Sequence, residues 1–556
     1  QIYDPNVSAD LLAKDPIAKV RDNNGHHQHD KISLPMDIYN NRRNSAGLDL
    51  SEDDPLRSLM TEISNNEDTP YDAPCIINGE DIKFGYTYSN TNPSNTDDKV
   101  GDVFYARNDD IQRAFSIAQT GFREWNQTDV KTRASILNTI ADLYEDNCET
   151  MMALLIREAG KTIPDAIAEV REAVDFCRYY AIEAQKHFKE IDLDGPTGER
   201  NSYYLEGRGV FVCISPWNFP LAIFTGQIVA ALVAGNAVIA KPAEQTPAIG
   251  AMAIRLMLKA GIPNGVLHLL QGAGDIGGRI IDHPNVAGVA FTGSTDVAKL
   301  IQRQLADKDG AIIPLIAETG GINAMIVDST ALPEQVTDDV LHSAFGSAGQ
   351  RCSALRILCV QNDVADEIVP MIKGAMDCLE VGDPRYLSTD VGPIIDDEAK
   401  ANLVDYRVSL EGRFKHLKET PFDSRLDGFG TYFTPVAVEI DSIDDIEKEA
   451  FGPILHILRY KEDDLDDLLC AINAKGYGLT FGLHSRILGK QQRLAAKIDA
   501  GNIYINRGQT GAVVGVQPFG GRGLSGTGPK AGGPHYLPAF ATEKSISDNI
   551  TASGGN

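Results

Sequence analysis

The fold is decided by residues 210–242, which read VFVCISPWNFPLAIFTGQIVAALVAGNAVIAKP. This stretch begins with VFVCI and ends with AVIA, two short apolar runs typical of buried strands. Between them lies a helix-like segment, LAIFTGQIVAALVA. Two more strand-like runs follow with helical patterns between them, VLHLL at 266–270 and VAFT at 289–292. This alternation predicts a doubly wound α/β fold on a parallel sheet, with ligands at the carboxyl ends of the strands.

Residues 221–240 could also be a membrane span, because they form a run of 20 residues without a charge. Gly235-Asn236 interrupts this run, and Pro220 and Pro242 bracket it. A buried helix followed by a core strand is therefore the favoured interpretation, and we expect no membrane span.

Composition and charge indicate an ordinary globular protein with several structural units. The 556 residues are 43% hydrophobic and 23% charged, and the net charge is −27. Such an acidic chain is a poor match for nucleic acid, which needs a basic face. The eight cysteines are scattered without disulfide or metal spacing, which favours reduced thiols and a cytoplasmic location. The cluster His26, His27 and His29 is interpreted as a solvated loop rather than a metal site, so we expect no metal.

Polar and glycine-rich segments follow the predicted strands, where ligands are expected. Gly272, Gly274 and Gly277 fit a dinucleotide fingerprint, although an ordinary turn explains them equally well. Gly293-Ser294 opens a helix, whose N-terminus favours a phosphate. Lys241 and Glu244 follow the second strand and are placed to bind ribose hydroxyls, with a surface charge as the alternative for the lysine.

A second α/β stretch begins after Ile312 and supplies a nucleophile and a base. Cys352 lies in a small-residue turn between glycine and arginine neighbours, a setting that can expose a thiol and hold it partly as thiolate. The other seven cysteines lie in apolar segments typical of inert thiols. Glu318 ends a strand-like run 34 residues earlier and is the candidate base. From residue 508 the chain is glycine-rich, which indicates loops near a site.

Taken in order, these motifs resemble the aldehyde dehydrogenase superfamily over about residues 76–545. The matching blocks are PWNFP, KPAEQTP, FTGST, ETGG, FGSAGQRCSA, EAFGP and QPFGG. Thr319, the loop GQRCSALR and the tail TGAVVGVQPFGG depart from the general pattern. They resemble the glutamate semialdehyde (pyrroline-5-carboxylate) dehydrogenases, and more narrowly the C-terminal half of the bifunctional proline utilization A flavoenzymes.

This resemblance implies oxidation of L-glutamate γ-semialdehyde to L-glutamate with NAD, the second step of proline catabolism. Cys352 would attack the aldehyde, the Asn218 amide and the Cys352 N–H would hold the oxyanion, and Glu318 would activate the hydrolytic water. Glu449 would hold the nicotinamide ribose, and Glu244 would repel a 2′-phosphate and so favour NAD over NADP. Gly272 and Gly277 are discounted, because the family does not use the glycine fingerprint in the usual way. The implied cofactor residues are Ile214, Ser215, Trp217, Lys241, Ala243, Glu244, Gly274, Thr292, Gly293, Ser294, Glu449 and Phe451.

The subfamily resemblance also implies how a substrate carboxylate is held. Its anchors would be Ser353 and the turn of Gly511 and Ala512, and Phe219 and Phe519 would enclose the aliphatic stem. Plain packing of Phe519 and an ordinary turn at Gly511-Ala512 are the alternatives. Two further interpretations of the chain are a dehydrogenase for another semialdehyde and a catalytically silent binding protein. A thiol acyltransferase or phosphorylating dehydrogenase would lack the hydrolytic Glu318.

The implied architecture is an aldehyde dehydrogenase fold with a Rossmann-like NAD-binding domain, an α/β catalytic domain and a β-flap for oligomerisation. We expect an N-terminal linker or arm over 1–75, the NAD-binding domain over 76–319, the catalytic domain over 320–524 and a C-terminal flap over 525–550. A flap strand at about 195–206 interrupts the NAD-binding domain. The expected partners are a second copy in a dimer and an upstream proline dehydrogenase domain. FAD would belong only to that upstream domain, which these residues do not contain.

Overall fold

The computed structural model describes residues 7–23, 32–414, 417–426 and 428–553. The chain divides into two compact units, residues 1–46 and 47–556. The first unit contains helices α1 (Ala9–Leu12) and α2 (Pro16–Asp22) and the 3-10 helix η1 (Pro35–Asp37). His26, His27 and His29 lie outside the described residues. All candidate site residues belong to the second unit.

The first large sheet of this unit has seven strands in the order β11-β10-β7-β8-β9-β1-β2. Five are parallel: β7 (Val210–Ile214), β8 (Ala237–Lys241), β9 (Leu267–Leu269), β10 (Val286–Gly293) and β11 (Leu315–Thr319). The short strands β1 (Cys75–Ile77) and β2 (Glu80–Ile82) extend the sheet in antiparallel fashion. The four strands predicted from residues 210–292 are therefore present, and the chain reverses its direction of travel across the sheet between β7 and β10.

The apolar run that resembles a membrane span is an internal helix, α8 (Ala222–Val233), followed by β8. Helix α8 packs against β7 and β8 on one side and against α5 (Val130–Asp146) and α7 (Ile163–His187) on the other. A helix that is apolar on every side is buried on every side. None of the helices in the described part of the chain has the length and apolarity that a membrane span requires.

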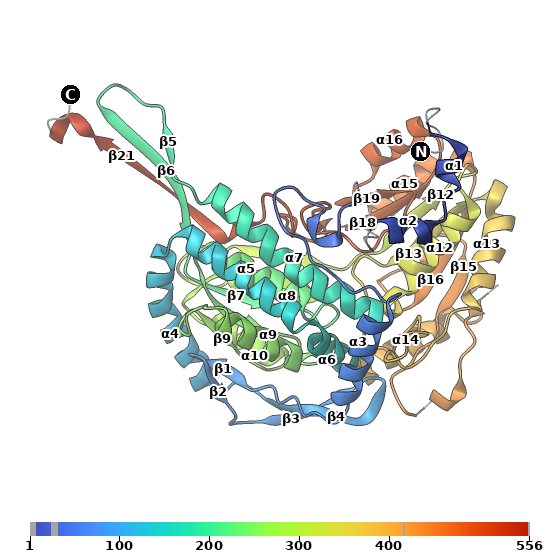
Figure 1. Ribbon diagram of the computed structural model, residues 1–556, viewed down its shortest axis with the longest axis horizontal. Coiled ribbons are helices and arrows are strands. Elements are labelled where there is room, and N and C mark those ends of the chain that lie inside the picture. Colours follow the sequence, from blue (N-terminus) through green and yellow to red (C-terminus); the bar gives the residue numbers. More distant parts are fainter. Residues whose placement is uncertain (1–6, 24–31, 415–416, 427, 554–556) are drawn as a thin grey trace. The chain divides into compact units, whose positions relative to one another are not determined.

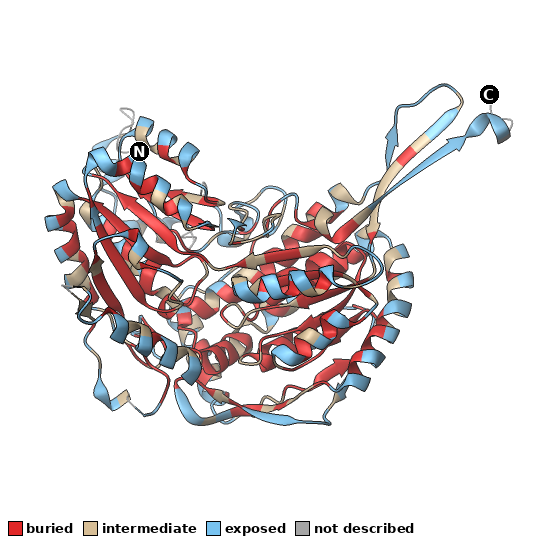
Figure 2. Ribbon diagram, turned by 180° about the vertical axis from the view of Figure 1, so that it is seen from behind, coloured by how far each residue is buried: buried red, intermediate tan, exposed pale blue. Residues whose placement is uncertain are grey.

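Helices surround this first sheet. The segment before β5 (Ile191–Leu193) forms α4 (Asn108–Gln127), α5, α6 (Cys148–Ala159) and α7. Helices α9 (Pro247–Lys259), α10 (Gly274–Asp282) and α11 (Thr295–Ala306) connect the parallel strands. Figure 2 shows the strands of both large sheets as mostly buried, whereas the outer faces of the helices are exposed.

The second large sheet has the order β14-β15-β16-β13-β12-β18-β19, and all of its strands except β14 (Lys418–Glu419) are parallel. Its centre is β12 (Asn323–Val327), β13 (Leu355–Gln361) and β16 (Ile454–Tyr460). The outer parallel strands are β15 (Val436–Ile440), β18 (Thr480–His484) and β19 (Asn502–Ile505). Helices α12 (Pro333–Phe345) and α13 (Asn362–Met376) pack on it, and a separate hydrophobic core surrounds each large sheet.

A third sheet, β21-β6-β5, extends away from the body of the second unit (Figure 1). It contains β5 (Ile191–Leu193), β6 (Glu199–Gly207) and β21 (Ala541–Asn549), all antiparallel. Seven of the nine residues of β21 are exposed. The strands near residue 200 and after residue 540 therefore pair as expected for a flap, although they are far apart in the sequence.

The sequence did not reveal several elements. The hairpin of β3 (Thr87–Asn92) and β4 (Asn95–Phe104) and the strand β18 were not expected. Residues 47–75 were assigned to an N-terminal arm, but they lie within the larger unit, where α3 (Asp53–Asn65) packs against α6. The predicted domain boundaries otherwise remain predictions.

Candidate active site

Strand topology brings Glu318 and Cys352 together. Glu318 lies near the carboxyl end of β11, and a three-residue turn leads from there into β12. Strand β12 pairs in parallel with β13, so the segment before β13, which carries Cys352, lies at the same edge of the sheet. Asn323 at the start of β12 confirms this arrangement, because its side-chain amide donates to the Cys352 carbonyl at 2.7 Å. The two residues lie close enough that the Glu318 charge acts on the pKa of the Cys352 thiol.

The loop before Cys352 has an unusual backbone. Ser347, Ala348 and Gly349 have φ values of 53°, 53° and 64°, a left-handed region that residues other than glycine rarely adopt. At Gly349 a Cβ atom would meet the Gly452 carbonyl oxygen at 2.3 Å, so only glycine fits. The loop is therefore pressed against the segment before β16.

The expectation that Cys352 is held partly as thiolate is wrong. The pKa of the Cys352 thiol is raised to about 12, chiefly by burial and in addition by the charges of Glu449, Glu318 and Glu172. The neighbouring Arg351 does not offset this effect, because its guanidinium binds Asp165 at 2.5 Å and Ser347 Oγ at 3.1 Å. The neutral thiol is thus the stable form at neutral pH.

Asn218 lies in the loop after β7 and reaches the nucleophile loop. Its side-chain Nδ2 donates to the Gln350 carbonyl at 3.0 Å, two residues before Cys352. On the other side, buried Lys161 donates to the Asn218 carbonyl and forms an ion pair with Glu169 at 3.3 Å. The amide expected to hold the oxyanion is therefore fixed beside the cysteine by contacts at both ends.

Glu318 is held by the glycine-rich tail. The Gly521 N–H donates to its Oε2 at 2.9 Å, whereas its buried Oε1 has no hydrogen-bond partner among the described residues. Burial raises the pKa of the Glu318 carboxyl to about 8, and the Gly521 N–H and the Lys530 charge oppose this shift. A carboxyl group that gains and loses a proton near neutral pH is suited to general acid–base chemistry. The tail also binds Thr319, whose hydroxyl donates to the Leu524 carbonyl at 2.6 Å.

Glu449 and Phe451 precede β16. An arginine whose role was not predicted from the sequence binds this segment. Arg356 Nη2 donates to Glu449 Oε1 at 2.9 Å, and its guanidinium carbon lies 5.4 Å from the Phe451 ring centroid. Burial raises the pKa of Glu449, and Arg356 opposes this shift. In the structure Glu449 thus binds Arg356, and its contact with a ribose remains a prediction.

Two of the expected cofactor residues lie on opposite sides of the point where the strand order reverses. Ser215 follows β7 and Thr292 lies in β10, and Gln227 of α8 joins them. Ser215 Oγ donates to Gln227 Oε1 at 2.8 Å, and Gln227 Nε2 donates to Thr292 Oγ1 at 2.9 Å. Open α/β sheets bind their ligands at this reversal, so the residues are where a dinucleotide site is expected.

The residues expected near the adenosine and pyrophosphate also lie at the carboxyl edge of this sheet. Lys241 Nζ lies 3.6 Å from Glu244 Oε2, and burial lowers the pKa of the lysine. Ser294 caps the N-terminus of α11, where its hydroxyl accepts from the Val297 N–H at 3.3 Å. Gly274 begins α10 and has open space where a side chain would project. The remaining expected cofactor residues at this edge are Ile214, Ala243 and Gly293.

Trp217 and Phe451 connect the two halves of the site. Trp217 follows β7 of the first sheet, and Phe451 precedes β16 of the second. Their rings meet edge to face, with centroids 5.6 Å apart and planes at 87°. At this contact, an expected cofactor residue from the first sheet therefore meets one from the second.

The expected substrate residues have different surroundings. The Phe219 ring lies 4.5 Å from Lys161 Nζ, which places a buried cation on its face. Ser353 is buried, and its carbonyl accepts from Thr480 Oγ1 at 3.1 Å. Phe519 pairs through its backbone with Ala531. Gly511 and the half-buried Ala512 lie in an irregular loop. Gly511 has φ 77°, and no atom of the described residues lies within 4 Å of the position where its Cβ would be.

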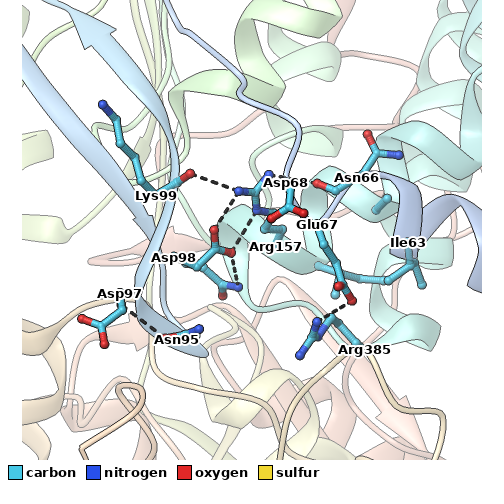
Figure 3. A pocket seen from close by; sticks show the side chains of 13 residues that line it. Ile63, Asn66, Glu67, Asp68, Asn95, Asp97, Asp98, Lys99, Arg157 and Arg385 are labelled. Atoms are coloured by element: carbon cyan, nitrogen blue, oxygen red, sulfur yellow. Dashed lines mark hydrogen bonds and ion pairs between the residues drawn. The ribbon is translucent and has the colours of Figure 1, made fainter.

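A cavity of about 370 Å³ lies elsewhere, between α3, α6 and β4 (Figure 3). Its polar groups bind one another: Arg157 Nη2 donates to Asp98 at 2.7 Å, and Arg385 Nη1 donates to Glu67 at 2.6 Å. None of its lining residues is one of the expected site residues. The cavity therefore does not contribute to the site described above.

Comparison with known proteins identifies the family. The model of the "Aldehyde dehydrogenase family" matches residues 83–546.

The chain belongs to the aldehyde dehydrogenase family.

Relatives within this family include bifunctional and monofunctional proteins. The chain is 47% identical over 551 residues to the "Bifunctional protein PutA" of Klebsiella aerogenes, which covers 97% of this chain but 41% of that protein. It is 36% identical over 485 residues to a "1-pyrroline-5-carboxylate dehydrogenase" of Geobacillus sp. (strain WCH70), covering 86% of this chain and 93% of that protein. The chain thus spans less than half the length of its PutA relative.

Solved structures confirm the aldehyde dehydrogenase fold. A "bifunctional proline utilization A (PutA) protein" superposes with a TM-score of 0.86 at 47% identity, covering 99% of this chain and 52% of that one. A 1-pyrroline-5-carboxylate dehydrogenase from Thermus with bound NAD has a TM-score of 0.87 at 31% identity, covering 92% of this chain and all of that one.

Three residues near this aldehyde dehydrogenase site were missed from the sequence: Gln227, Arg356 and Glu172. Glu172 of α7 raises the pKa of Cys352, and burial raises its own pKa to about 8. Gln227 and Arg356 lie within quoted stretches of the sequence, LAIFTGQIVAALVA and GQRCSALR, but no pattern there gave either residue a role. Only their contacts with distant segments reveal them.

Proposed function

We propose that the chain oxidises L-glutamate γ-semialdehyde, the open form of pyrroline-5-carboxylate, to L-glutamate with NAD. This reaction is the second step of proline catabolism. The observation that carries the proposal is the meeting of Asn218, Glu318 and Cys352, from three separate segments, at one edge of the second sheet. A thiol, an amide donor and a buried carboxyl group are the groups that oxidation through a thioester requires.

The proposed substrate is supported by relatives of two kinds. The Geobacillus relative named 1-pyrroline-5-carboxylate dehydrogenase matches over nearly its whole length. The PutA relatives match over the same part of this chain within longer proteins. Gln509, two residues before Gly511, donates to the carbonyl of buried Ser353 at 3.4 Å, which supports an anchor for the substrate carboxylate at this place.

The chain's own residues account for the chemistry. The Cys352 thiol gives its proton to solvent, and its sulfur bonds to the aldehyde carbon while the carbonyl oxygen gains negative charge. The Asn218 amide and the Cys352 N–H bind that oxygen. NAD, when bound, supplies the acceptor for the hydride that the resulting hemithioacetal loses. Loss of the hydride leaves a thioester on Cys352. Glu318 as carboxylate then takes a proton from water, whose oxygen bonds to the thioester carbon. The carbon–sulfur bond breaks, the carboxylic acid leaves, and the sulfur takes the proton from Glu318, which restores the thiol and the carboxylate.

The residues present fit NAD. Lys241 and Glu244 lie together at a strand end, as needed for a diol of ribose, and a second negative charge at the 2′ position would meet the Glu244 carboxylate. Ser294 presents the N-terminus of α11, which favours a phosphate. Gln227 holds Ser215 and Thr292 in place between these groups. The Thermus relative of known structure has bound NAD, which supports the same cofactor here.

The test is the formation of NADH with glutamate semialdehyde, beside propanal and succinic semialdehyde, with Cys352→Ala as the control. A preference for glutamate semialdehyde that is lost in the variant is expected. Similar activity with all three aldehydes would contradict the proposed substrate, but it would still support NAD-dependent aldehyde oxidation. If the chain binds NAD but oxidises none of the three aldehydes, the proposal that this chain catalyses the reaction by itself would be contradicted.

We also propose that the chain forms a dimer through the β21-β6-β5 sheet. The sheet extends from the body, and β21 is paired on one side only within this sheet, so its other edge offers backbone groups to a second copy. Light scattering after size-exclusion chromatography tests this, and Ile546→Asp, a change at a 46% exposed position on β21, is expected to weaken the dimer.

An upstream proline dehydrogenase domain carrying FAD remains a proposed partner, supported by the longer PutA relatives. A cytoplasmic location remains a proposal too, and the eight free cysteines favour it.

A further inference from the structure

Arg356 is a buried cation whose guanidinium binds two loops at once. It is 1% exposed and lies on β13, four residues after Cys352. Its Nη1 donates to the carbonyls of Gly349 at 2.8 Å and Gly452 at 3.0 Å. Its Nη2 donates to the Arg351 carbonyl at 3.2 Å and to Glu449 at 2.9 Å.

The strand order explains why one side chain reaches both loops. Strands β13 and β16 are parallel neighbours, so the segments that precede them lie side by side. Arg356 is the second residue of β13 and therefore lies next to both loops. Its own carbonyl is bound by His456 Nδ1 at 2.9 Å, and His456 Nε2 lies 2.9 Å from the Tyr406 hydroxyl. Hydrogen bonds thus hold both the side chain and the main chain of Arg356 in place.

The contact with the Arg351 carbonyl bears directly on the reaction. This carbonyl and the Cys352 N–H belong to the same peptide group, which is trans, because the only cis peptide bond in the described residues is Gly528-Pro529. In a planar trans peptide the C=O and the N–H point in opposite directions. A cation that binds the oxygen therefore fixes the direction of the N–H, and it draws electron density from the nitrogen, which makes the N–H a stronger donor.

We propose that Arg356 is a positioning residue that orients and polarises the Cys352 N–H as an oxyanion donor. The inference rests on the proposed role of Cys352 as nucleophile. Arg356 touches neither the reacting atoms nor the substrate, and it acts through the peptide group between residues 351 and 352. Its bond to Glu449 ties the same guanidinium to the expected cofactor loop.

The forked shape of arginine is essential to this role. The guanidinium binds three carbonyls and one carboxylate, whereas a lysine ammonium keeps the charge but cannot span the four acceptors. The variant Arg356→Lys therefore keeps the positive charge and removes the hydrogen-bonding geometry.

Two reactions of the same thiol test the proposal without NAD or the natural substrate. Acylation by p-nitrophenyl acetate passes through a tetrahedral oxyanion, whereas alkylation by iodoacetamide forms none. The ratio of the two rate constants cancels changes in the thiolate fraction. For Arg356→Lys we expect this ratio to fall by at least about tenfold, since loss of a single oxyanion donor typically costs a hundredfold or more. Because neither reagent is an aldehyde, the result can be interpreted even if glutamate semialdehyde is not the substrate.

Two variants serve as controls. Arg133 is another buried arginine that holds main-chain carbonyls, with Nε donating to Val233 at 3.0 Å and Nη1 to Thr128 at 2.9 Å, and Arg133→Lys is expected to keep the ratio. Glu158→Gln removes a buried carboxylate from α6, outside the site, and it too should keep the ratio. An unchanged ratio in Arg356→Lys, or an equal fall in either control, would overturn the proposal. If Arg356→Lys fails to fold by circular dichroism, Arg356→Gln replaces it, and the same ratio decides.

Discussion

The side-chain amide of Asn218 donates a hydrogen bond of 3.0 Å to the carbonyl oxygen of Gln350. This bond joins the loop after β7 of the first sheet to the loop before β13 of the second. It holds one candidate oxyanion donor beside the peptide group that supplies the other. Under the proposed mechanism, both donors would thus be positioned before any substrate arrives, which is the condition under which such donors contribute most to catalysis.

Asn218→Ala is expected to lower kcat for aldehyde oxidation about a hundredfold to a thousandfold, because it removes one donor to the oxyanion. Binding of NAD, measured by calorimetry, should change little. Asn147→Ala is a suitable control, since its amide binds the Leu143 carbonyl within a helical segment far along the chain. An unaltered kcat in Asn218→Ala would show that the amide only joins the two loops.

Glu318 predicts the pH dependence of the hydrolytic step. Its pKa is raised to about 8, so the carboxylate form that can accept a proton is scarce below this value and increases as the pH rises through it. The steady-state rate should therefore rise with pH and level off above about 8. Glu318→Gln should give a burst of NADH followed by slow turnover, measured by stopped-flow absorbance.

Glu158→Gln is a matched control for this experiment. Glu158 is also buried with a pKa raised to about 8, but it binds the N–H groups of Ala248 and Ile249 at the start of α9. Its replacement should leave the shape of the profile unchanged. A wild-type rate that does not vary with pH through the neutral range would exclude Glu318 as the limiting base.

The Cys352 thiol is expected to react slowly with iodoacetamide at neutral pH. Its pKa is raised to about 12, so the rate should increase about tenfold per pH unit through the alkaline range. Glu449→Gln should accelerate the reaction, because Glu449 is the charge that raises this pKa most. Mass spectrometry identifies the modified cysteine, and Cys352→Ala is the control. A plateau near neutral pH would contradict the raised pKa.

Ser353→Ala tests the proposed carboxylate anchor. It should raise KM for glutamate semialdehyde about tenfold to a hundredfold, since a hydrogen bond to a charged group contributes about 1.5–3 kcal/mol. The KM for propanal, which has no carboxylate, should stay the same. The hydrogen bond from the Thr480 hydroxyl to the main-chain carbonyl of residue 353 remains in the variant, so the loop is retained. Equal changes for both aldehydes would disprove the anchor.

Much of the fold could be predicted from short-range patterns. The apolar runs at 210–214 and 237–240 become β7 and β8 with nearly the same bounds, because buried parallel strands are apolar throughout. The helix between them could be distinguished from a membrane span because Gly235-Asn236 limits its length. Strand β18 was missed even though it lies inside the second sheet, and the segment before it carries no turn or motif that drew attention.

By itself, the sequence determined the order of β7, β8, β9 and β10 with the helices between them, the family, and the identity of the candidate nucleophile, base and amide donor, because these depend on local patterns and ordered motifs. Tertiary structure alone decided their electrostatics. Arg351 directly precedes Cys352 in the chain, and its positive charge suggested a stabilised Cys352 thiolate. In the structure its guanidinium instead binds Asp165, 186 residues away in the sequence. Arg356 likewise acquires its role through Glu449, 93 residues away. A charge acts through distance and burial, and only the folded chain determines both.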